Sequence, residues 1–169
     1  TLGLRPRVPP ARMGGFTLWL GFCLCRHLAE YCKIPLRIKW PNDLVCAGRK
    51  LAGILTEMQS EADSVQGLAF GIGLNINGDF KKAPETVRAV AGSLRMAAGR
   101  PFSLNAVAAQ TMACLARASD AFFASEAWRA ELFAQWPAFD ALAGKSICVR
   151  GLDQTVRMAT ALGLADDGG

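Results

Sequence analysis

The chain has 169 residues, of which 51% are hydrophobic and 20% are charged, and its formal net charge is +5. This length suits one domain with a small appendage and excludes two full-sized domains, and the composition is that of a globular protein with a hydrophobic core. The positive charge favours an anionic partner such as a nucleotide or an acidic protein. Nucleic acid is disfavoured as the partner, because the basic residues are scattered and the sequence contains no helix-turn-helix or zinc-finger spacing.

The six cysteines predict buried thiols rather than a metal site. None of them forms a C-x-x-C pair and His27 is the only histidine, so a zinc site would need thiolates at unusual spacings. Three cysteines fall in one apolar stretch, which is typical of reduced thiols inside a cytosolic protein. The longest uncharged apolar run, residues 14–25, is shorter than the roughly 18 residues needed to span a bilayer, and no secretory signal is visible. We therefore expect a cytoplasmic protein with no intrinsic metal.

The first predicted elements are a strand and a buried helix. Residues 1–13 begin as a short apolar strand and continue as a proline-stiffened loop. Residues 15–32 are apolar on nearly every side, which indicates a helix packed inside the domain. Pro35 prevents its extension.

The next elements are predicted strands. Residues 36–46 have the pattern of a strand interrupted at Pro41, and residues 50–59 return as a second strand after a turn, so the two form a hairpin. Residues 66–77 predict a third strand. Its apolar, glycine-interrupted sequence is typical of a central strand that another backbone or a ligand approaches closely.

The second half of the chain is predicted to be mainly helical. Residues 78–102 are expected to form a long loop, and an amphipathic helix follows from Ser103, its expected N-cap, to about residue 124. A second helix is expected over residues 125–135, and alternating residues after Pro137 predict the opening of a small β unit. This order of elements indicates an α+β fold, in which helices pack on one face of a mixed β-sheet.

The segment from Lys39 to Glu57 holds the densest cluster of chemically distinctive residues. Its sequence Trp40-Pro41-Asn42-Asp43 interrupts a strand, and the simplest interpretation of that sequence alone is a turn at a sheet edge. Lys39 and Lys50 flank this unit, however, and a hairpin brings both ammonium groups to the same end of a sheet. The two lysines on either side of the turn therefore favour a functional interpretation.

Two lysines and an aspartate suit the activation of a carboxylate by ATP. The carboxylate attacks the α-phosphate while negative charge gathers on the phosphoryl oxygens, and a lysine is a mobile point charge that can follow those oxygens. Asp43 has three possible roles here: it holds a lysine, a Mg²⁺ ion or a ribose hydroxyl. The sequence leaves these alternatives open.

Glycines in the strands indicate close approach by another group. Strict alternation places Lys50 and Gly53 on opposite faces of their strand unless a bulge intervenes. Gly71 and Gly73 are likewise glycines inside the next predicted strand. Asn75 follows them, and its amide can donate to and accept from the edge of an adenine. The GIG sequence does not match the GxGxxG dinucleotide motif, and the chain has no GxxxxGK[ST] phosphate loop.

Three blocks of sequence resemble the signature blocks of biotin–protein ligases, also called biotin–[acetyl-CoA-carboxylase] ligases. They are KWPND at residues 39–43, RKLAGILTE at residues 49–57 and GIGLNIN at residues 71–77. The resemblance implies a two-step reaction, in which biotin and Mg·ATP first form biotinyl-5′-AMP and pyrophosphate. A lysine of a biotin carboxyl carrier protein then attacks the mixed anhydride. The implied cofactors are thus ATP with its Mg²⁺, and the implied partner is the carrier, with a homodimer as a further possibility.

The resemblance also implies roles for individual residues. The lysine that matches Lys50 contacts the biotin carboxylate and the phosphate, and the segment that matches Gly53 and Ile54 lines the biotin pocket. Lys50, Asp43 and Lys39 are the implied catalytic residues. The residues implied at ATP or the adenylate are Lys39, Asn42, Asp43 and Asn75. Arg49 is a weaker candidate, which we expect to be solvated in its turn.

The chain departs from the family pattern at both ends. It contains no GRGRxGR-type loop, and the SH3-like C-terminal domain of the family is expected to stop after about two strands. We expect residues 1–140 to be a partial catalytic domain, residues 141–169 to be the start of the SH3-like domain, and the chain to be a fragment that adenylates biotin poorly. The alternatives are a lipoate or octanoate ligase-type enzyme and a non-catalytic binding module on the same fold.

Overall fold

The main layer of the protein is a five-stranded antiparallel sheet in the order β1-β5-β4-β3-β2. The structure is a computed structural model that describes residues 1–151 and 153–165. The strands of the sheet are β1 (Leu2–Leu4), β2 (Arg37–Lys39), β3 (Asp43–Cys46), β4 (Arg49–Glu61) and β5 (Ser64–Leu74). The predicted α+β class is confirmed, but the strands of the sheet pair antiparallel rather than in the expected mixed arrangement. Within the described part of the chain, parallel pairing is limited to two isolated bridges, Ile38 with Asp140 and Lys50 with Ala91.

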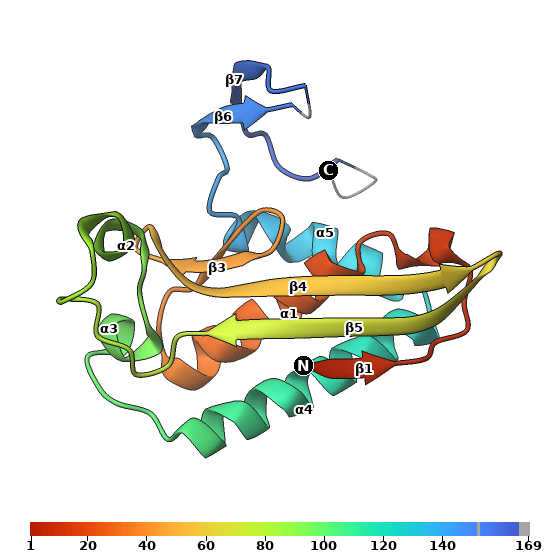
Figure 1. The fold of residues 1–169 in the computed structure, drawn as a ribbon, viewed down its shortest axis with the longest axis horizontal. Coiled ribbons are helices and arrows are strands. Elements are labelled where there is room, and N and C mark those ends of the chain that lie inside the picture. Colours follow the sequence, from red (N-terminus) through yellow and green to blue (C-terminus); the bar gives the residue numbers. More distant parts are fainter. Residues whose placement is uncertain (152, 166–169) are drawn as a thin grey trace.

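The long helices cover one face of this sheet, two short helices lie at one end of it, and most of the other face is open (Figure 1). The helices are η1 (Pro10–Met13), α1 (Phe16–Cys32), α2 (Glu85–Val90), α3 (Leu94–Ala98), α4 (Leu104–Ala124) and α5 (Ala127–Phe139). A separate two-stranded sheet of β6 (Ser146–Arg150) and β7 (Val156–Thr160) lies beyond the end of α5. The expected domain boundary between residues 140 and 141 stays a prediction, although the change of sheet occurs there.

Helix α1 is the centre of the hydrophobic core, as its sequence predicts. Its apolar side chains pack between the sheet and α4 and α5, and Phe22 and Leu20 are fully buried. The helix begins after Gly15, whose φ of +83° and whose distance of 2.6 Å from an added Cβ to the Trp128 ring both require glycine. No helix in residues 1–151 and 153–165 is long and apolar enough to cross a membrane.

The cysteines are free thiols, and five of the six are buried. Burial raises the pKa of Cys23 and of Cys25 to about 12, so both stay protonated at neutral pH. The described residues contain no group of three or more His, Cys, Asp or Glu side chains that could hold a metal ion.

Three segments differ from the expectations in detail. Residues 36–46 form two antiparallel strands, β2 and β3, rather than one interrupted strand, because the chain reverses at residues 40–42. Residues 78–102 contain the short helices α2 and α3, so the prediction of an uninterrupted loop is wrong. Ser103 caps α4 as predicted, since its hydroxyl accepts a hydrogen bond from the backbone N–H of Ala106.

Candidate functional site

An ion pair on the open face of the sheet forms the centre of the candidate site. Lys50 Nζ lies 2.5 Å from Asp43 Oδ1, and the two side chains come from the adjacent strands β4 and β3. The Lys50 side chain is 51% exposed and that of Asp43 is 21% exposed, so the ammonium group is accessible to a ligand while the carboxylate is half-sheltered.

A register shift between Leu44 and Val45 explains how Lys50 reaches this face. Asp43 is paired with Gly53, but Val45 is paired with Lys50, so the regular alternation of β4 is broken between these positions. The sequence allowed for such a bulge but did not predict it. Its consequence is that Lys50 and Gly53 face the same side of the sheet.

Gly53 leaves room for the ion pair. A Cβ atom added at Gly53 would lie 3.1 Å from Lys50 Nζ and 3.2 Å from Asp43 Oδ1. A side chain there would therefore crowd both charged groups. The predicted reason for this glycine, close approach by another group, is met in the structure by the side chains of Lys50 and Asp43.

A cavity of about 510 Å³ lies beside the ion pair. Its walls come from β4, from the end of β5 and from α2, and they include Lys50, Gly53, Gly73, Asn75 and Val90. Backbone groups fix Asn75 on both sides, because its N–H donates to Leu51 and its carbonyl accepts from Leu94. Its side-chain amide makes no hydrogen bond to any part of the chain that the structure describes, so it remains available to a ligand.

Lys39 lies on β2, directly beside Asp43 of β3 and one strand farther from Lys50. The two residues are paired in register, and the side chain of Lys39 is exposed on the same face. The structure thus brings both lysines to one end of the sheet, as the hairpin pattern predicts. Lys39 borders a different cavity from Lys50, however.

Asn42 and Ile54 have structural partners. The Asn42 side chain donates a 2.8 Å hydrogen bond to the Ile54 carbonyl, and the Ile54 N–H donates to the Asn42 carbonyl. The Ile54 side chain is 1% exposed and packs in the core, near Gly21 of α1. The structure therefore does not bring the Ile54 side chain to the open face, and the Asn42 amide nitrogen holds β4 in place beside the site.

Arg49 has a role that the sequence did not indicate. It is half-buried rather than solvated, and its guanidinium donates hydrogen bonds to the backbone carbonyls of Arg88 and Ala91, the latter at 3.2 Å. These carbonyls lie at the C-terminal end of α2, where a cation is favoured. Because the Gly92 N–H also donates to the Lys50 carbonyl, Arg49 and Lys50 together hold α2 against the site.

We expect Arg49→Ala to loosen the wall of the site that α2 forms. Losing two hydrogen bonds from a charged donor should cost about 1.5–3 kcal/mol locally, which corresponds to faster amide exchange in residues 84–92 by about tenfold or more. Hydrogen–deuterium exchange followed by mass spectrometry measures this, and peptides from α4 serve as the internal control. Arg49→Lys should show a smaller increase, and equal protection in all three proteins would contradict the assignment.

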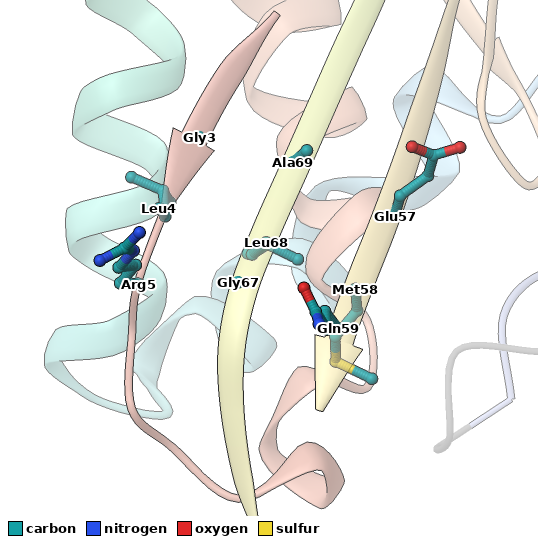
Figure 2. A pocket seen from close by; sticks show the side chains of 9 residues that line it. All are labelled: Gly3, Leu4, Arg5, Glu57, Met58, Gln59, Gly67, Leu68 and Ala69. Carbon is teal, nitrogen blue, oxygen red and sulfur yellow. The ribbon is translucent and has the colours of Figure 1, made fainter. Parts of the chain in front are cut away.

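A second and larger hollow, of about 680 Å³, lies farther along the same open face (Figure 2). Small residues of β1 and β5, namely Gly3, Gly67 and Ala69, form its floor. Figure 2 shows Arg5 and Glu57 on opposite sides of the hollow, separated by β5. Because Glu57 is paired with Ala69 and Gly53 with Gly73, Glu57 lies four register pairs along β4 from the glycine beside the ion pair.

Two other polar residues are structural. The Asn77 amide holds the loop before α4, since it donates to the Phe102 carbonyl and accepts from the Phe102 N–H. His27 lies 3.1 Å from Gln110 on the helical side of the sheet, away from Lys50. Neither belongs to the site.

Comparison with known proteins agrees with the resemblance of the three blocks. Residues 2–77 match the family described as "Biotin/lipoate A/B protein ligase family". The chain is 31% identical over 168 residues to the bifunctional ligase/repressor BirA of Bacillus subtilis, which is 99% of this chain and 51% of the relative. It is 34% identical over 90 residues to the biotin–[acetyl-CoA-carboxylase] ligase of Mycobacterium tuberculosis, which is 52% of this chain and 30% of the relative.

The fold is similar to that of solved biotin protein ligases. The enzyme from Aquifex aeolicus, solved in complex with biotin and ATP, superposes with a TM-score of 0.77 at 22% identity, over 96% of this chain and 67% of that chain. The chain spans about half the length of the curated relative from Bacillus subtilis. The match to the Biotin/lipoate A/B protein ligase family thus covers residues 2–77, the part of the chain that holds the five-stranded sheet and α1.

Proposed function

We propose that this chain is part of a biotin–protein ligase, which forms biotinyl-5′-AMP from biotin and ATP and transfers biotin to a lysine of a biotin carboxyl carrier protein. The observation that carries the proposal is the exposed ion pair of Lys50 and Asp43 beside Gly53, next to a cavity into which Asn75 brings an unengaged amide. The names of the sequence relatives agree with this substrate, since they include biotin–[acetyl-CoA-carboxylase] ligases.

In the first step, a carboxylate oxygen of biotin attacks the α-phosphorus of ATP, and pyrophosphate leaves. Negative charge gathers on the oxygens of the α-phosphate as the new bond forms. The Lys50 ammonium group can move from the biotin carboxylate to these oxygens and stabilise that charge. Asp43 holds the ammonium group in place until the substrates arrive. Asp43, with Lys39 beside it on β2, would also hold the Mg²⁺ ion that accompanies ATP, and the ion would offset negative charge on the phosphates.

The apolar part of biotin has a suitable surface beside the ion pair. Leu55 follows Gly53 by two residues on the open face and is 63% exposed, and its register partner on β5 is Gly71. An exposed leucine opposite glycines forms a flat apolar surface of the kind that a fused bicyclic ring can cover. Asn75, at the other side of Gly53, then faces the adenine.

In the second step, the ε-amine of the carrier lysine attacks the carbonyl carbon of biotinyl-5′-AMP. The bond from this carbon to the phosphate oxygen breaks, AMP leaves, and the amine loses a proton. Lys50 stabilises the negative charge on the departing phosphate, as it does in the first step.

We place the protein in the cytoplasm, since five of its six thiols are buried and all are free.

Ligand binding tests the proposal directly. We expect the chain to bind biotinyl-5′-AMP at least about tenfold more tightly than lipoyl-5′-AMP or AMP, because only the biotinyl ring matches the flat surface at Leu55. Isothermal titration calorimetry with the three compounds measures the difference. Tighter binding of lipoyl-5′-AMP would mean that the site prefers an acyl group other than biotin. Equal affinity for all three compounds would mean that the site recognises the nucleotide alone.

A further inference from the structure

A basic hollow lies at the edge of the sheet formed by β2, next to the site of the proposed function. It has a volume of about 520 Å³, and Arg37, Lys39 and Lys145 are among the residues that line it. Arg37 and Lys39 alternate with Ile38, which is 0% exposed, so both cations point out of the core. Lys145 comes from the segment that joins α5 to β6, on the far side of the hollow.

The segment that carries Lys145 is braced against the sheet. The Ala141 N–H donates a 2.8 Å hydrogen bond to the Ile38 carbonyl. Asp140 is 6% exposed, and its carboxylate accepts hydrogen bonds from the Trp136 ring N–H and the Leu142 backbone N–H. These contacts fix the path of the chain up to Lys145.

Hydrogen bonds also hold the backbone of Lys145 itself. Its N–H donates to the Leu142 carbonyl, and its own carbonyl accepts from Ala161 after β7. Together with the bond from Ala141 to Ile38, these contacts set the position of the Lys145 backbone relative to β2.

The positive charge of the hollow is not neutralised by the described residues. None of the three cations forms a salt bridge within residues 1–151 and 153–165, and the lining contains no carboxylate. Arg37 donates only to the backbone carbonyls of Ala138 and Asp140, which orient the guanidinium but carry no net charge. Three like charges around one hollow create a positive potential that favours an anionic partner.

The position of the hollow indicates which anion it meets. Lys39 is the register partner of Asp43, so the hollow begins one strand away from the ion pair of the site. A carrier lysine must approach that pair, and it arrives as a cation in a region that already holds Lys39 and Lys50. Acidic side chains near the acceptor lysine would offset this repulsion if they met the basic hollow.

We propose that Arg37, Lys39 and Lys145 form a docking surface for acidic side chains of the carrier protein, which places the acceptor lysine at Lys50 and Gly53. This inference rests on the proposed function. Apolar groups from Val45 and Ala141 also line the hollow, and no helix of the described chain directs its N-terminus there as a phosphate cradle would. Both features fit a protein surface better than a free phosphate.

The test measures binding of the full chain to the unmodified biotin carboxyl carrier domain of acetyl-CoA carboxylase. At low salt, Lys145→Glu should weaken binding by about tenfold and Lys145→Gln by about threefold, and both effects should shrink several-fold when the salt is raised tenfold. The matched control is Arg117→Glu, which makes the same charge change on α4. It should stay within about twofold of the unaltered chain.

Each outcome has a distinct meaning. Equal effects of Lys145→Glu and Arg117→Glu, or a Lys145→Glu effect that salt does not change, would overturn the docking surface. The proposal of a docking surface would also be wrong if inorganic pyrophosphate displaced the carrier and bound less well to Lys145→Glu, because the hollow would then be a phosphate site. Failure of the unaltered chain to bind biotinyl-5′-AMP would instead count against the proposed function, whereas normal binding with an unchanged carrier affinity would remove the docking surface alone.

Discussion

Replacement of Lys50 by methionine should weaken the binding of biotinyl-5′-AMP by about 100-fold or more. The change removes the ammonium group that lies 2.5 Å from Asp43 while it keeps a side chain of similar length and apolar volume. It also leaves the half-sheltered Asp43 carboxylate without its partner, directly beside the site of an anionic phosphate. The ligand therefore loses an attraction and gains a repulsion, which isothermal titration calorimetry measures as a higher Kd.

A double-variant cycle separates these two effects. Asp43→Asn in the Lys50→Met background removes the stray negative charge, so it should recover about tenfold of the lost affinity. Lys82→Met, in the exposed loop after β5, is the control for loss of one positive charge and should change Kd by less than about twofold. If Lys50→Met bound the adenylate as tightly as the control, Lys50 would not be part of the site.

Replacement of Phe22 by alanine should lower the free energy of unfolding by about 3–5 kcal/mol. Phe22 is 0% exposed at the centre of α1, and its ring packs at 5.7 Å from Trp19 and at 5.5 Å, edge-on, from Phe139. The change removes the buried ring and leaves a cavity between α1 and α5 that the surrounding helices can close only in part. Urea denaturation followed by tryptophan fluorescence measures the loss as a lower midpoint.

An exposed residue provides the comparison for this stability change. Leu162 is 92% exposed, and Leu162→Ala should alter the free energy of unfolding by less than about 0.5 kcal/mol. A similar loss in both variants would mean that α1 does not form the core. A lower slope of the unfolding transition for Phe22→Ala alone would indicate instead a change in the two-state behaviour of the chain.

The site combines groups that are individually ordinary and jointly selective. Lys50 supplies the movable charge, Asp43 positions it, and Gly53 keeps the space around both of them open. Arg49 contributes indirectly, because it holds α2 in place as a wall of the adjoining cavity. A change at any of the four positions should therefore alter ligand affinity more than it alters the fold.

Much of the fold could be predicted from local sequence. The apolar stretch that becomes α1, the Ser103 cap of α4 and the glycine-interrupted strand β5 each carry a short-range signal in periodicity, capping or composition. The candidates Lys39, Asp43 and Lys50 came from the turn residues and lysines that concentrate in one hairpin, and Asn75 came from the amide that follows the glycines of β5; their roles stay predictions. The helices α2 and α3 escaped prediction, since six and five residues are too few for a periodic pattern to emerge.

The sequence by itself determined the buried helix, the hairpin and the chemical groups available for catalysis, because these depend on neighbours a few residues apart. Tertiary structure alone decided which of those groups meet. The bulge at Leu44 and Val45 turned Lys50 toward Asp43, the packing of α1 drew Ile54 into the core, and the return of the chain after α5 brought Lys145 beside Lys39. Each of these outcomes depends on strand register or on packing between distant segments, and a one-residue change of register reverses the face of a side chain.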